Sequence, residues 1–371
     1  MRTEQIALAP LAPGANVALT VHRFGAPGAR PRVYIQAALH ADEIPGMLAA
    51  HHLRERLQVQ EAEGRLRGEV ILVPSANPIG LSQRLLSHRV GRFDLADGQN
   101  FNRGYPYLVP QVAERIANRL GADEARNVAL VREALVAELQ AWPAASPAEV
   151  LKKTLVGLAI EADLVLDMHC DSEAVMHLYT LTPSADTFAP LGALLGAEAI
   201  LLATESGDDP FDEACSRPWH ELRERFPNHP LPLGCEATTL EFRGEADVTH
   251  DFAAADAGAV VDFLVLRGLI EGPPPAVPAP RCQPTPLEAS EPLESPAAGI
   301  VVYHAAPGAR VRSGDRIADI VDPLTGETTP VAATTDGVLY ARVLGRFTGA
   351  GRRIGKVAGT VPKRKGKLLS P

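Results

Sequence analysis

The chain has 371 residues, of which 46% are hydrophobic and 22% are charged, and its formal net charge is −9. These values are ordinary for a globular protein, and the length suits two domains. An acidic balance without a long basic block argues against nucleic acid and anionic membranes as partners. The N-terminal stretch MRTEQIALAP lacks the apolar core of a signal peptide, so we expect a cytoplasmic protein.

The first part of the chain alternates between strand and helix patterns. Continuous apolar runs predict buried strands, and apolar residues at helical spacing predict helices. The predicted strands are residues 32–40, 68–76, 163–169 and 237–244, and the clearest predicted helices are residues 46–57 and 250–270. This alternation predicts an α/β domain over residues 1–271, with a mixed, largely parallel sheet flanked by helices.

Residues 110–162 have a helical pattern that looks like an insertion between core strands. In SPAEVLKK, Ser146 can cap the first turn of a helix, and Pro147 suits the first helical position. Glu149 can reach back to the cap, which would complete a capping box. The sequence therefore predicts a helix that begins at Pro147.

A proline-rich segment, EGPPPAVPAPRCQPTPLE, separates the α/β part from a C-terminal part of different character. Proline at this density favours an extended connector, which we expect over residues 272–290. Residues 291–371 contain short β-branched runs broken by turns, which predict an all-β domain. The order of strands and turns in SPAAGIVVYHAAPGARVRSGDRI resembles that of biotinyl/lipoyl carrier modules. The tip that would carry the modified lysine reads DPLTGET, so we expect a structural or substrate-gating domain instead of a carrier.

His40 and Glu43 stand three residues apart in AALHADEIPGM, between a predicted strand and a predicted helix. Imidazole and carboxylate are sound zinc ligands. A histidine beside a helix and a glutamate attracted to its positive end would give the same pattern. His169 closes another predicted strand, and ligands gather at the carboxyl ends of strands in α/β sheets. The three residues therefore predict a site for one Zn²⁺ ion, with a fourth position open for water.

Three further residues on the predicted strands carry candidate chemistry. Asp167 lies on the same side of its strand as His169 and can fix the tautomer of that imidazole. Glu241, within TTLEF, is costly to bury without a purpose and could act as the base for an attacking water, although on an edge strand it could face solvent. Arg243 shares the face of Glu241, so it could pair with Glu241, bind a substrate carboxylate or be a surface charge.

The loop GRFDLADGQNFNRGYP combines Arg92, Asp97, Asn102 and Arg103 in a turn-rich segment. An arginine can hold a carboxylate through two hydrogen bonds or stabilise an oxyanion, and an asparagine amide can add a donor. A polar loop held by Asx turns would have the same composition. Because the loop follows a predicted strand, we favour a functional role.

These motifs resemble those of the succinylglutamate desuccinylase/aspartoacylase family, which belongs to the zinc-carboxypeptidase-like hydrolases. In chain order they read HADE, SANPIG, DGQNFNR, DMH and TLEFRG. The resemblance runs from about Val33 to Ile270, and the C-terminal β domain also fits the family. It implies a zinc-carboxypeptidase-like fold in which the β domain leans over the mouth of the active site.

The resemblance also implies roles for individual residues. Zinc would be bound by His40, Glu43 and His169, and Glu241 would be the general base and acid. Arg92 would polarise the scissile carbonyl or hold the oxyanion, and Asn102 with Arg103 would bind the substrate carboxylate. The family commonly reads Asp-Leu-Asn-Arg, whereas here Asn-Phe precedes Asn102 and the aspartate is displaced to Asp97. Because of this departure, Arg84, Arg89 and Arg92 all compete for the role at the oxyanion.

We therefore predict a zinc-dependent hydrolase that cleaves the amide of an N-acyl amino acid or a similar small carboxylate. A carboxypeptidase acting on peptides would use the same residues, and so would an esterase. A non-catalytic metal-binding protein of the same fold is the alternative from another class. The sequence leaves open the acyl group, the amino acid and whether the chain forms a homo-oligomer.

Overall fold

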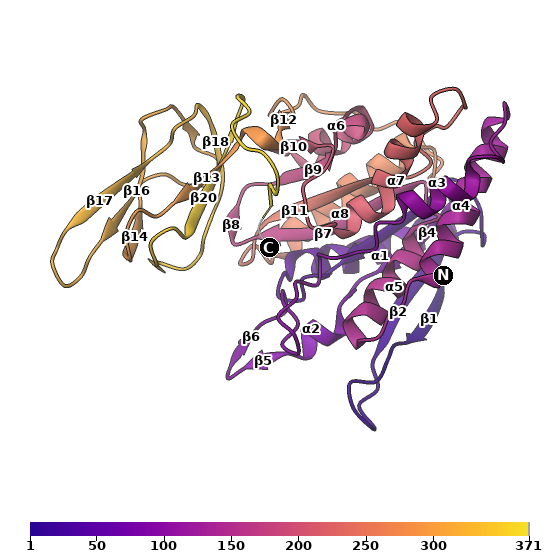
Figure 1. Ribbon diagram of the computed structural model, residues 1–371, viewed down its shortest axis with the longest axis horizontal. Coiled ribbons are helices and arrows are strands. Elements are labelled where there is room, and N and C mark those ends of the chain that lie inside the picture. Colours follow the sequence, from indigo (N-terminus) through magenta and orange to yellow (C-terminus); the bar gives the residue numbers. More distant parts are fainter. Residues whose placement is uncertain (370–371) are drawn as a thin grey trace.

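The computed structural model describes residues 1–369, which form an α/β part and a smaller all-β part (Figure 1). A nine-stranded sheet is the centre of the α/β part, with the strand order β1-β2-β4-β3-β7-β11-β9-β10-β12. In that order the bounds are Arg2–Ala7, Ala18–Phe24, Glu69–Val73, Arg32–Ala37, Leu164–Asp171, Glu236–Gly244, His177–Leu181, Ala199–Ala203 and Thr285–Pro286. The pairs β4–β3, β3–β7, β7–β11 and β9–β10 are parallel, and β1–β2, β2–β4 and β11–β9 are antiparallel. The prediction of a mixed, largely parallel sheet is confirmed.

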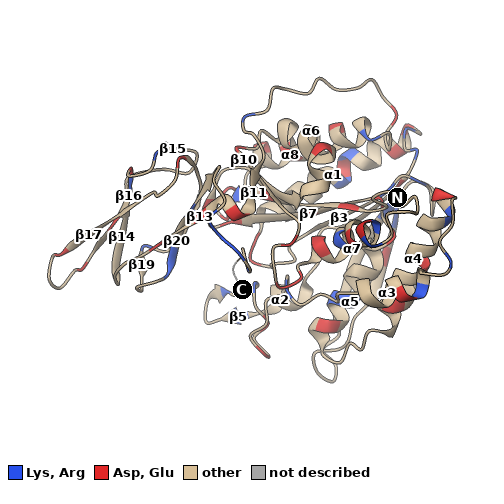
Figure 2. Cartoon of the chain, turned by 45° about the horizontal axis from the view of Figure 1, so that its top comes forward, with Lys and Arg blue, Asp and Glu red and all other residues tan. Residues whose placement is uncertain are grey.

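Helices cover both faces of this sheet, as Figure 2 shows. One layer consists of α1 (Pro45–Ala62), α6 (Ala185–Leu195) and α8 (His250–Leu266). The other consists of α3 (Val109–Ile116), α4 (Glu124–Ala141), α5 (Pro147–Ala159) and α7 (Phe211–Arg225). Each layer packs on the sheet through its own hydrophobic cluster. The central strands are buried on both faces for this reason, which explains their continuous apolar runs.

Local sequence explains where two of these helices begin. The capping box predicted for α5 is present, because Glu149 N donates to Ser146 Oγ and the Glu149 carboxylate accepts from Ser146 N. α1 begins at Pro45, whose fixed φ suits a first turn. A Cβ atom at Gly46 would lie 2.9 Å from the carbonyl oxygen of Met168. Glycine therefore lets the start of α1 pack directly against β7.

The C-terminal part is all-β, as predicted, and is built around its own hydrophobic cluster. One sheet contains β13 (Ser290–Glu294), β20 (Arg353–Gly359), β18 (Gly337–Arg342) and β15 (Arg310–Val311). The other contains β17 (Thr328–Ala332), β16 (Arg316–Val321), β14 (Gly299–Tyr303) and β19 (Phe347–Thr348). The resemblance to a biotinyl/lipoyl module stays a prediction.

The segment between the two parts is extended along most of its length. No helix or strand is assigned over residues 271–284. Thr285–Pro286, within the predicted linker, forms the edge strand β12 that pairs with β10, and a short 3₁₀ turn, η2 (Leu287–Ala289), follows. Pro286 has no amide hydrogen to donate to a neighbouring strand. It is tolerated at the edge of the sheet because one side of an edge strand is unpaired. The chain is thus tied to the main sheet before it enters the β part at Ser290.

Contacts beside β7 join the two parts. The short strand β8 (Glu173–Ala174) pairs with β18, so a piece of the α/β part extends a sheet of the β part. The Glu173 carboxylate accepts hydrogen bonds from Arg342 at 2.5 Å and from Arg346 at 2.6 Å. Lys356 Nζ donates to Asp171 Oδ2 at 2.5 Å. Because Asp171 ends β7, the β part is attached next to the strand that carries His169.

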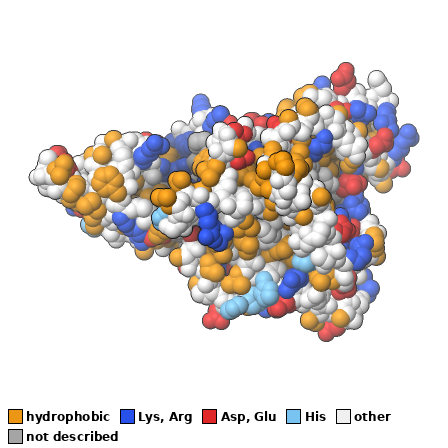
Figure 3. Space-filling view, turned by 90° about the horizontal axis from the view of Figure 1, so that it is seen from below, with side chains coloured by type: hydrophobic (Ala, Val, Ile, Leu, Met, Phe, Trp, Pro, Cys, Tyr) orange, Lys and Arg blue, Asp and Glu red, His pale blue; other side chains and the backbone are white. Residues whose placement is uncertain are grey.

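The remaining elements are short and lie in connections. They are α2 (Pro78–Ser82), the hairpin strands β5 (Arg84–Leu85) and β6 (His88–Arg89), and the 3₁₀ turn η1 (Thr182–Ser184). On the face shown in Figure 3, basic, acidic and hydrophobic side chains are interspersed. None of the helices within residues 1–369 combines the length and apolar character needed to cross a membrane.

Candidate metal centre

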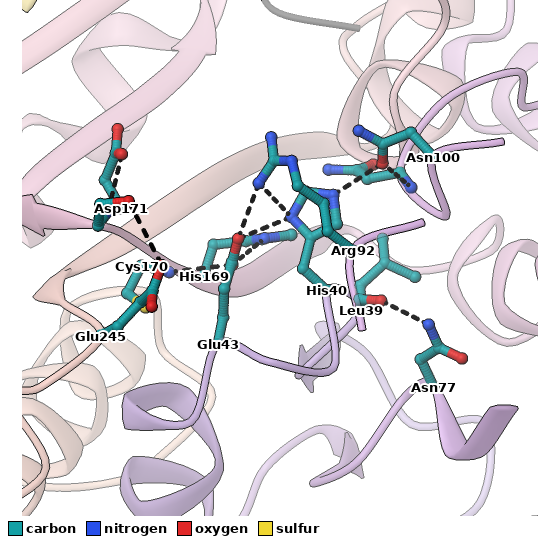
Figure 4. Close-up of polar contacts among 12 residues, drawn as sticks. Leu39, His40, Glu43, Asn77, Arg92, Asn100, His169, Cys170, Asp171 and Glu245 are labelled. Carbon is teal, nitrogen blue, oxygen red and sulfur yellow. Dashed lines mark hydrogen bonds and ion pairs between the residues drawn. The ribbon is translucent and has the colours of Figure 1, made fainter. Parts of the chain in front are cut away.

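His40 lies in the turn between β3 and α1, and the SANPIG motif holds that turn. The backbone reverses at Ala38, which has a φ of 58°. Asn77 Nδ2 donates to the carbonyl oxygen of Leu39 at 2.9 Å, as Figure 4 shows. Asn77 Oδ1 also accepts from Gly80 N at 2.8 Å and caps α2. One buried amide therefore fixes the residue next to His40.

A second loop approaches the same turn and brings Arg92 to it. Ala41 N donates to the carbonyl oxygen of Gly91 at 3.0 Å. A Cβ atom at Gly91 would lie only 2.6 Å from Asp42 N, so this approach requires glycine. Arg92 Nη1 consequently lies 3.1 Å from His40 Nδ1.

The structure brings together His40, Glu43 and His169, whose ligand atoms all lie within 4.8 Å of one another. His40 Nδ1 is 2.8 Å from Glu43 Oε1, and His169 Nδ1 is 2.7 Å from Glu43 Oε2 (Figure 4). Cys170 N donates to Glu43 Oε2 at 3.1 Å, which orients the carboxylate. The three side chains are at most 7% exposed. Two imidazole nitrogens and a carboxylate thus converge on one buried point. We call His40, Glu43 and His169 the metal set.

The outer nitrogens of both imidazoles are held by acceptors. His169 Nε2 lies 2.9 Å from Asp167 Oδ2, and His40 Nε2 lies 2.8 Å from Asn100 Oδ1. Asn100 Oδ1 also accepts from Asn102 N, which fixes the orientation of the Asn100 amide. A hydrogen on each Nε2 leaves the lone pair of each Nδ1 facing the centre. This donor set, with its outer acceptors, fits a divalent ion such as zinc.

The charges of the three residues also suit a cation. Burial, reinforced by the charge of Arg92, lowers the pKa of His40 to about 4, so this imidazole is neutral. Burial alone would raise the pKa of Glu43, but the two imidazoles hold it well below its usual range. Burial would lower the pKa of His169, yet Asp167 and Glu43 raise it well above its usual value. The protonated His169 balances these carboxylates, a role that a bound cation would take over.

Glu241 lies next to this set on the central sheet. It stands directly opposite His169 on β7 and directly opposite His177 on β9. Its Oε2 atom is buried and has no hydrogen-bond partner in the described part of the chain. Burial, together with the charge of Glu43, raises the pKa of Glu241 to about 8. A carboxyl group that titrates near neutral pH beside a metal set is suited to proton transfer.

A cavity of about 270 Å³ contains the metal set and Glu241 and is lined by both parts of the molecule. The α/β part supplies Arg92, Asn102 and Arg103, and the β part supplies Arg342 and Lys356. Basic side chains from both parts of the molecule therefore line the pocket. Such a pocket favours an anionic or carboxylate-bearing ligand.

Asn102 and Arg103 line this pocket, and their loop is firmly held. Asn102 Oδ1 accepts from Phe211 N at 2.9 Å, which joins the loop to the first turn of α7. Lys152 Nζ, on α5, donates to the carbonyl oxygen of Arg103 at 2.7 Å. Helix α5, within the predicted insertion, and α7, outside it, therefore support the loop that carries both residues.

The structure distinguishes Arg92 from Arg84 and Arg89, the other two arginines considered for the role at the oxyanion. Arg84 and Arg89 lie on the exposed β5–β6 hairpin, outside the pocket lining. Arg92 lines the pocket and donates to Glu43 Oε1 at 3.1 Å. Asp97 accepts from Gln99 N in a surface turn and lies away from the metal set. Of the three arginines, Arg92 is the one placed to contact a reacting group.

Arg243 is the predicted site residue that the structure places elsewhere. Its φ of 62° and a register shift after Glu241 turn its side chain away from the face of Glu241. The guanidinium donates to Asp256 Oδ1 on α8 at 3.2 Å and lies 4.4 Å from the ring centre of Phe252. Arg243 would share the face of Glu241 only on an uninterrupted strand, and the bulge after Glu241 interrupts β11. Arg243 joins a strand to a helix and lies outside the pocket.

Three residues in or beside the pocket have no role predicted from the sequence: Asp171 and Lys356 line it, and Asn100 contacts His40. Asn100 lies within the DGQNFNR motif, but its contact with His40 depends on how this loop packs. Asp171 lies two residues after the DMH motif, at the end of its strand. Because ligands gather at such strand ends, this position in the sequence indicates a candidate site residue. Lys356 lies far along the chain on β20, and no sequence pattern connects it to this site.

Comparison with known proteins agrees with the sequence motifs. Residues 29–134 match the model of the succinylglutamate desuccinylase/aspartoacylase catalytic domain, and this segment contains His40, Glu43 and Arg92. None of the curated proteins matches the sequence significantly.

Solved structures match nearly the whole chain. A succinylglutamate desuccinylase/aspartoacylase family protein from Shewanella amazonensis is 26% identical, with a TM-score of 0.85 over 96% of this chain and 98% of its own. One from Shewanella frigidimarina is 24% identical, with a TM-score of 0.86 over 96% and 97%. The ectoine utilization protein EutE from Ruegeria pomeroyi shares the fold at 18% identity, with a TM-score of 0.68 over 97% and 95%. With the catalytic-domain match over residues 29–134 and the near full-length structural agreement, this chain is similar to proteins of the succinylglutamate desuccinylase/aspartoacylase family.

Proposed function

We propose that this protein is a zinc-dependent hydrolase that cleaves the amide bond of an N-acyl amino acid or a similar small carboxylate. The observation that carries the proposal is the position of Glu241, opposite His169 and in one pocket with the buried metal set. The match of residues 29–134 to the catalytic domain of succinylglutamate desuccinylase/aspartoacylase supports the reaction class. The basic side chains of the pocket support a carboxylate-bearing substrate.

The metal would be held by His40 Nδ1, His169 Nδ1 and the Glu43 carboxylate. Asn100 and Asp167 would accept the Nε2 hydrogens and keep both rings aimed at the centre. A zinc ion bound there would polarise the scissile carbonyl and lower the pKa of an attacking water to about 7.

Glu241 would transfer the proton in this reaction. Its carboxylate accepts the proton of the attacking water, which leaves a nucleophile next to the scissile carbonyl. It then gives that proton to the leaving nitrogen, so that a neutral amine departs. The raised pKa of Glu241 and the unpartnered Oε2 atom support both steps, because the group can hold the proton and has a free oxygen to receive it.

Arg92 and the Asn102–Arg103 pair would position the substrate. Arg92 would donate to the carbonyl oxygen as it gains negative charge, which requires its guanidinium to leave Glu43. Asn102 and Arg103 would bind the substrate carboxylate. The β part, with Arg342 and Lys356 in the wall, would close the pocket and exclude water.

This assignment uses the domain division expected from the sequence. Residues 1–271 would be the catalytic domain, with the helical insertion at 110–162 supporting the Arg103 loop. Residues 272–290 would be the linker, and residues 291–371 the domain that closes the pocket.

The test is a metal analysis of the purified protein together with a screen of N-acetyl and N-succinyl amino acids, short peptides and acyl esters. We expect one zinc ion per chain and amide hydrolysis that the Glu241→Gln variant lacks. Preference for peptides would indicate a carboxypeptidase, and preference for esters an esterase. Stoichiometric metal without turnover on any of these substrates would contradict an enzymatic function.

A further inference from the structure

One wall of the pocket carries two carboxyl groups that the proposed reaction does not use. Asp212 and Glu213 lie in the first turn of α7 and are 9% and 5% exposed. Ser206, in the loop before that helix, is 4% exposed and lines the same pocket. We call these three residues the acidic wall.

Two polar atoms of the acidic wall lack a hydrogen-bond partner, although one of them, Glu213 Oε2, lies 3.8 Å from Arg217 Nη1. Ser206 Oγ and Glu213 Oε2 are buried without a hydrogen-bond partner among residues 1–369. The other carboxylate oxygen, Glu213 Oε1, accepts from Ser206 N at 2.7 Å, so the group is fixed in place. Native proteins rarely leave buried hydrogen-bonding groups unpaired, because each unpaired group destabilises the fold. These two atoms therefore point to a ligand that supplies donors.

The positive charges near the acidic wall, those of Arg103 and Arg217, do not keep the pKa values of its two carboxyl groups at their ordinary level. Burial raises the pKa of Asp212 to about 6, and burial together with the charge of Asp212 raises that of Glu213 to about 7. Arg217 Nη1 lies 3.8 Å from Glu213 Oε2, but this arginine also pairs with three other carboxylates, those of Glu205, Asp209 and Glu221. A cation placed against the acidic wall would relieve both carboxyl groups.

Apolar side chains complete this region of the pocket. Leu181, Leu201 and Ala203 line the same cavity; Leu181 and Ala203 end strands β9 and β10, and Leu201 lies within β10. An aliphatic chain can pack against such residues while its charged end reaches polar partners. Arg103, the proposed carboxylate ligand, interacts electrostatically with both Asp212 and Glu213. The amino-acid half of a substrate held at Arg103 would therefore lie next to the acidic wall.

We propose that the acidic wall binds the ammonium group of an aminoalkyl side chain. The preferred substrate is then an amino acid with a basic side chain, such as lysine or ornithine, acylated on its α-nitrogen. This inference rests on the proposed amide hydrolysis, because it names the substrate class of the same site. The carboxylate binds at Arg103, the methylene groups contact the leucines, and the ammonium group donates to Glu213 Oε2 and Ser206 Oγ.

The first test compares kcat/KM for Nα-acetyl-lysine and Nα-acetyl-ornithine with values for Nα-acetyl-norleucine and Nα-acetyl-glutamate. We expect the two basic substrates to exceed norleucine by at least about tenfold, because a buried carboxylate left without its partner rejects the neutral analogue. Glu213→Gln and Ser206→Ala should reduce this ratio. Glu224→Gln, on the same helix with a side chain that is 66% exposed, should leave it unchanged.

Binding is measured separately, so that failure of the chemistry does not hide failure of the inference. Calorimetry with the Glu241→Gln variant should give tighter binding of Nα-acetyl-lysine than of Nα-acetyl-norleucine. Equal binding, or equal or faster hydrolysis of the norleucine or glutamate substrate, would overturn the inference while amide hydrolysis still stood. Selective binding of the lysine compound without turnover of any acyl amino acid would instead overturn the proposed function. If Glu213→Gln does not fold, Ser206→Ala and the wild-type substrate ratios still decide the question.

Discussion

Glu241 on β11 and His169 on β7 are directly opposite each other in the parallel pairing of these two strands. Residues that face each other across neighbouring strands present their side chains on the same side of the sheet. The proposed base and a proposed metal ligand are therefore brought together by strand register. A slip of β11 by one residue would move Glu241 to the opposite face.

Replacing Glu241 with glutamine should abolish turnover while the fold and the metal site remain. Glutamine has the same shape but cannot accept and return a proton, so we expect kcat to fall by at least about 100-fold. Activity and zinc content are measured on the same sample. Glu236→Gln, at the other end of β11, is the control and should keep normal kcat. Full activity in the Glu241→Gln variant would remove Glu241 from the proposed mechanism.

Replacing His169 with alanine should remove the metal. Two of the three proposed ligands would remain, and these are too few to hold zinc in a catalytic site. We expect substoichiometric zinc by elemental analysis and loss of activity, and we expect a chelator to inactivate the wild type until zinc is added back. His51→Ala, on α1 with a side chain that is 44% exposed, is the control. Stoichiometric zinc in the His169→Ala variant would show that the metal binds elsewhere.

Asn100 should tune metal affinity without binding the metal. Its Oδ1 atom holds His40 Nε2 at 2.8 Å, so alanine would free the His40 ring to rotate. We expect Asn100→Ala to weaken zinc binding by about 10- to 100-fold in a competition with a chromogenic chelator. Asn100→Asp keeps an acceptor at that position and should recover most of the affinity. Equal affinities of the alanine variant and the wild type would mean that the ring is oriented by packing alone.

The grouping of His40, Glu43 and His169 was predictable from the sequence because the positions of these residues follow local rules. His40 and His169 come after apolar runs, and parallel strands end at the same edge of a sheet. The α5 capping box was predictable for the same reason, since it involves neighbours in the chain. The C-terminal all-β part followed from its turns and short β-branched runs.

The residues that were missed or misplaced depend on distant packing or on one backbone angle. Lys356 reaches Asp171 across a separation of 185 residues, and no spacing rule covers such a contact. Arg243 was expected to share a face with Glu241, but its positive φ breaks the alternation of the strand. The acidic wall lies at the start of a helix, where acidic residues are common, so its burial became evident only in the folded chain.

Arg243 should matter for stability and not for substrate binding. Arg243→Met would leave the Asp256 side chain, which is 7% exposed, without its ion-pair partner. We expect the free energy of unfolding to fall by about 3 kcal/mol, measured by urea denaturation, with KM unchanged. Adding Asp256→Asn should restore part of this loss, because the unpaired charge is then removed. A large rise in KM without loss of stability would return Arg243 to the substrate site.

The ion pair between Asp171 and Lys356 should make the attachment of the β part depend on pH. Burial alone would raise the pKa of Asp171, but the charge of Lys356 lowers it to about 2, below the ordinary value of 3.8. A lowered carboxyl pKa stabilises the fold above the ordinary value, and this contribution is lost as pH falls through about 2. The shift corresponds to about 2 kcal/mol, so Lys356→Met should be less stable than the wild type by roughly that amount at pH 6.

The difference between the two proteins should shrink as pH falls from 3.8 toward 2, because the unfolded chain then binds a proton that the folded wild type must lose to keep the ion pair. Free energies of unfolding from urea titrations at pH 6 and pH 3 measure this change. Lys365→Met, an exposed position near the end of the chain, is the control and should match the wild type at both pH values. A stability loss in Lys356→Met that is the same at both pH values would come from lost packing on Tyr340, whose ring centre lies 5.8 Å from Lys356 Nζ, and not from the ion pair.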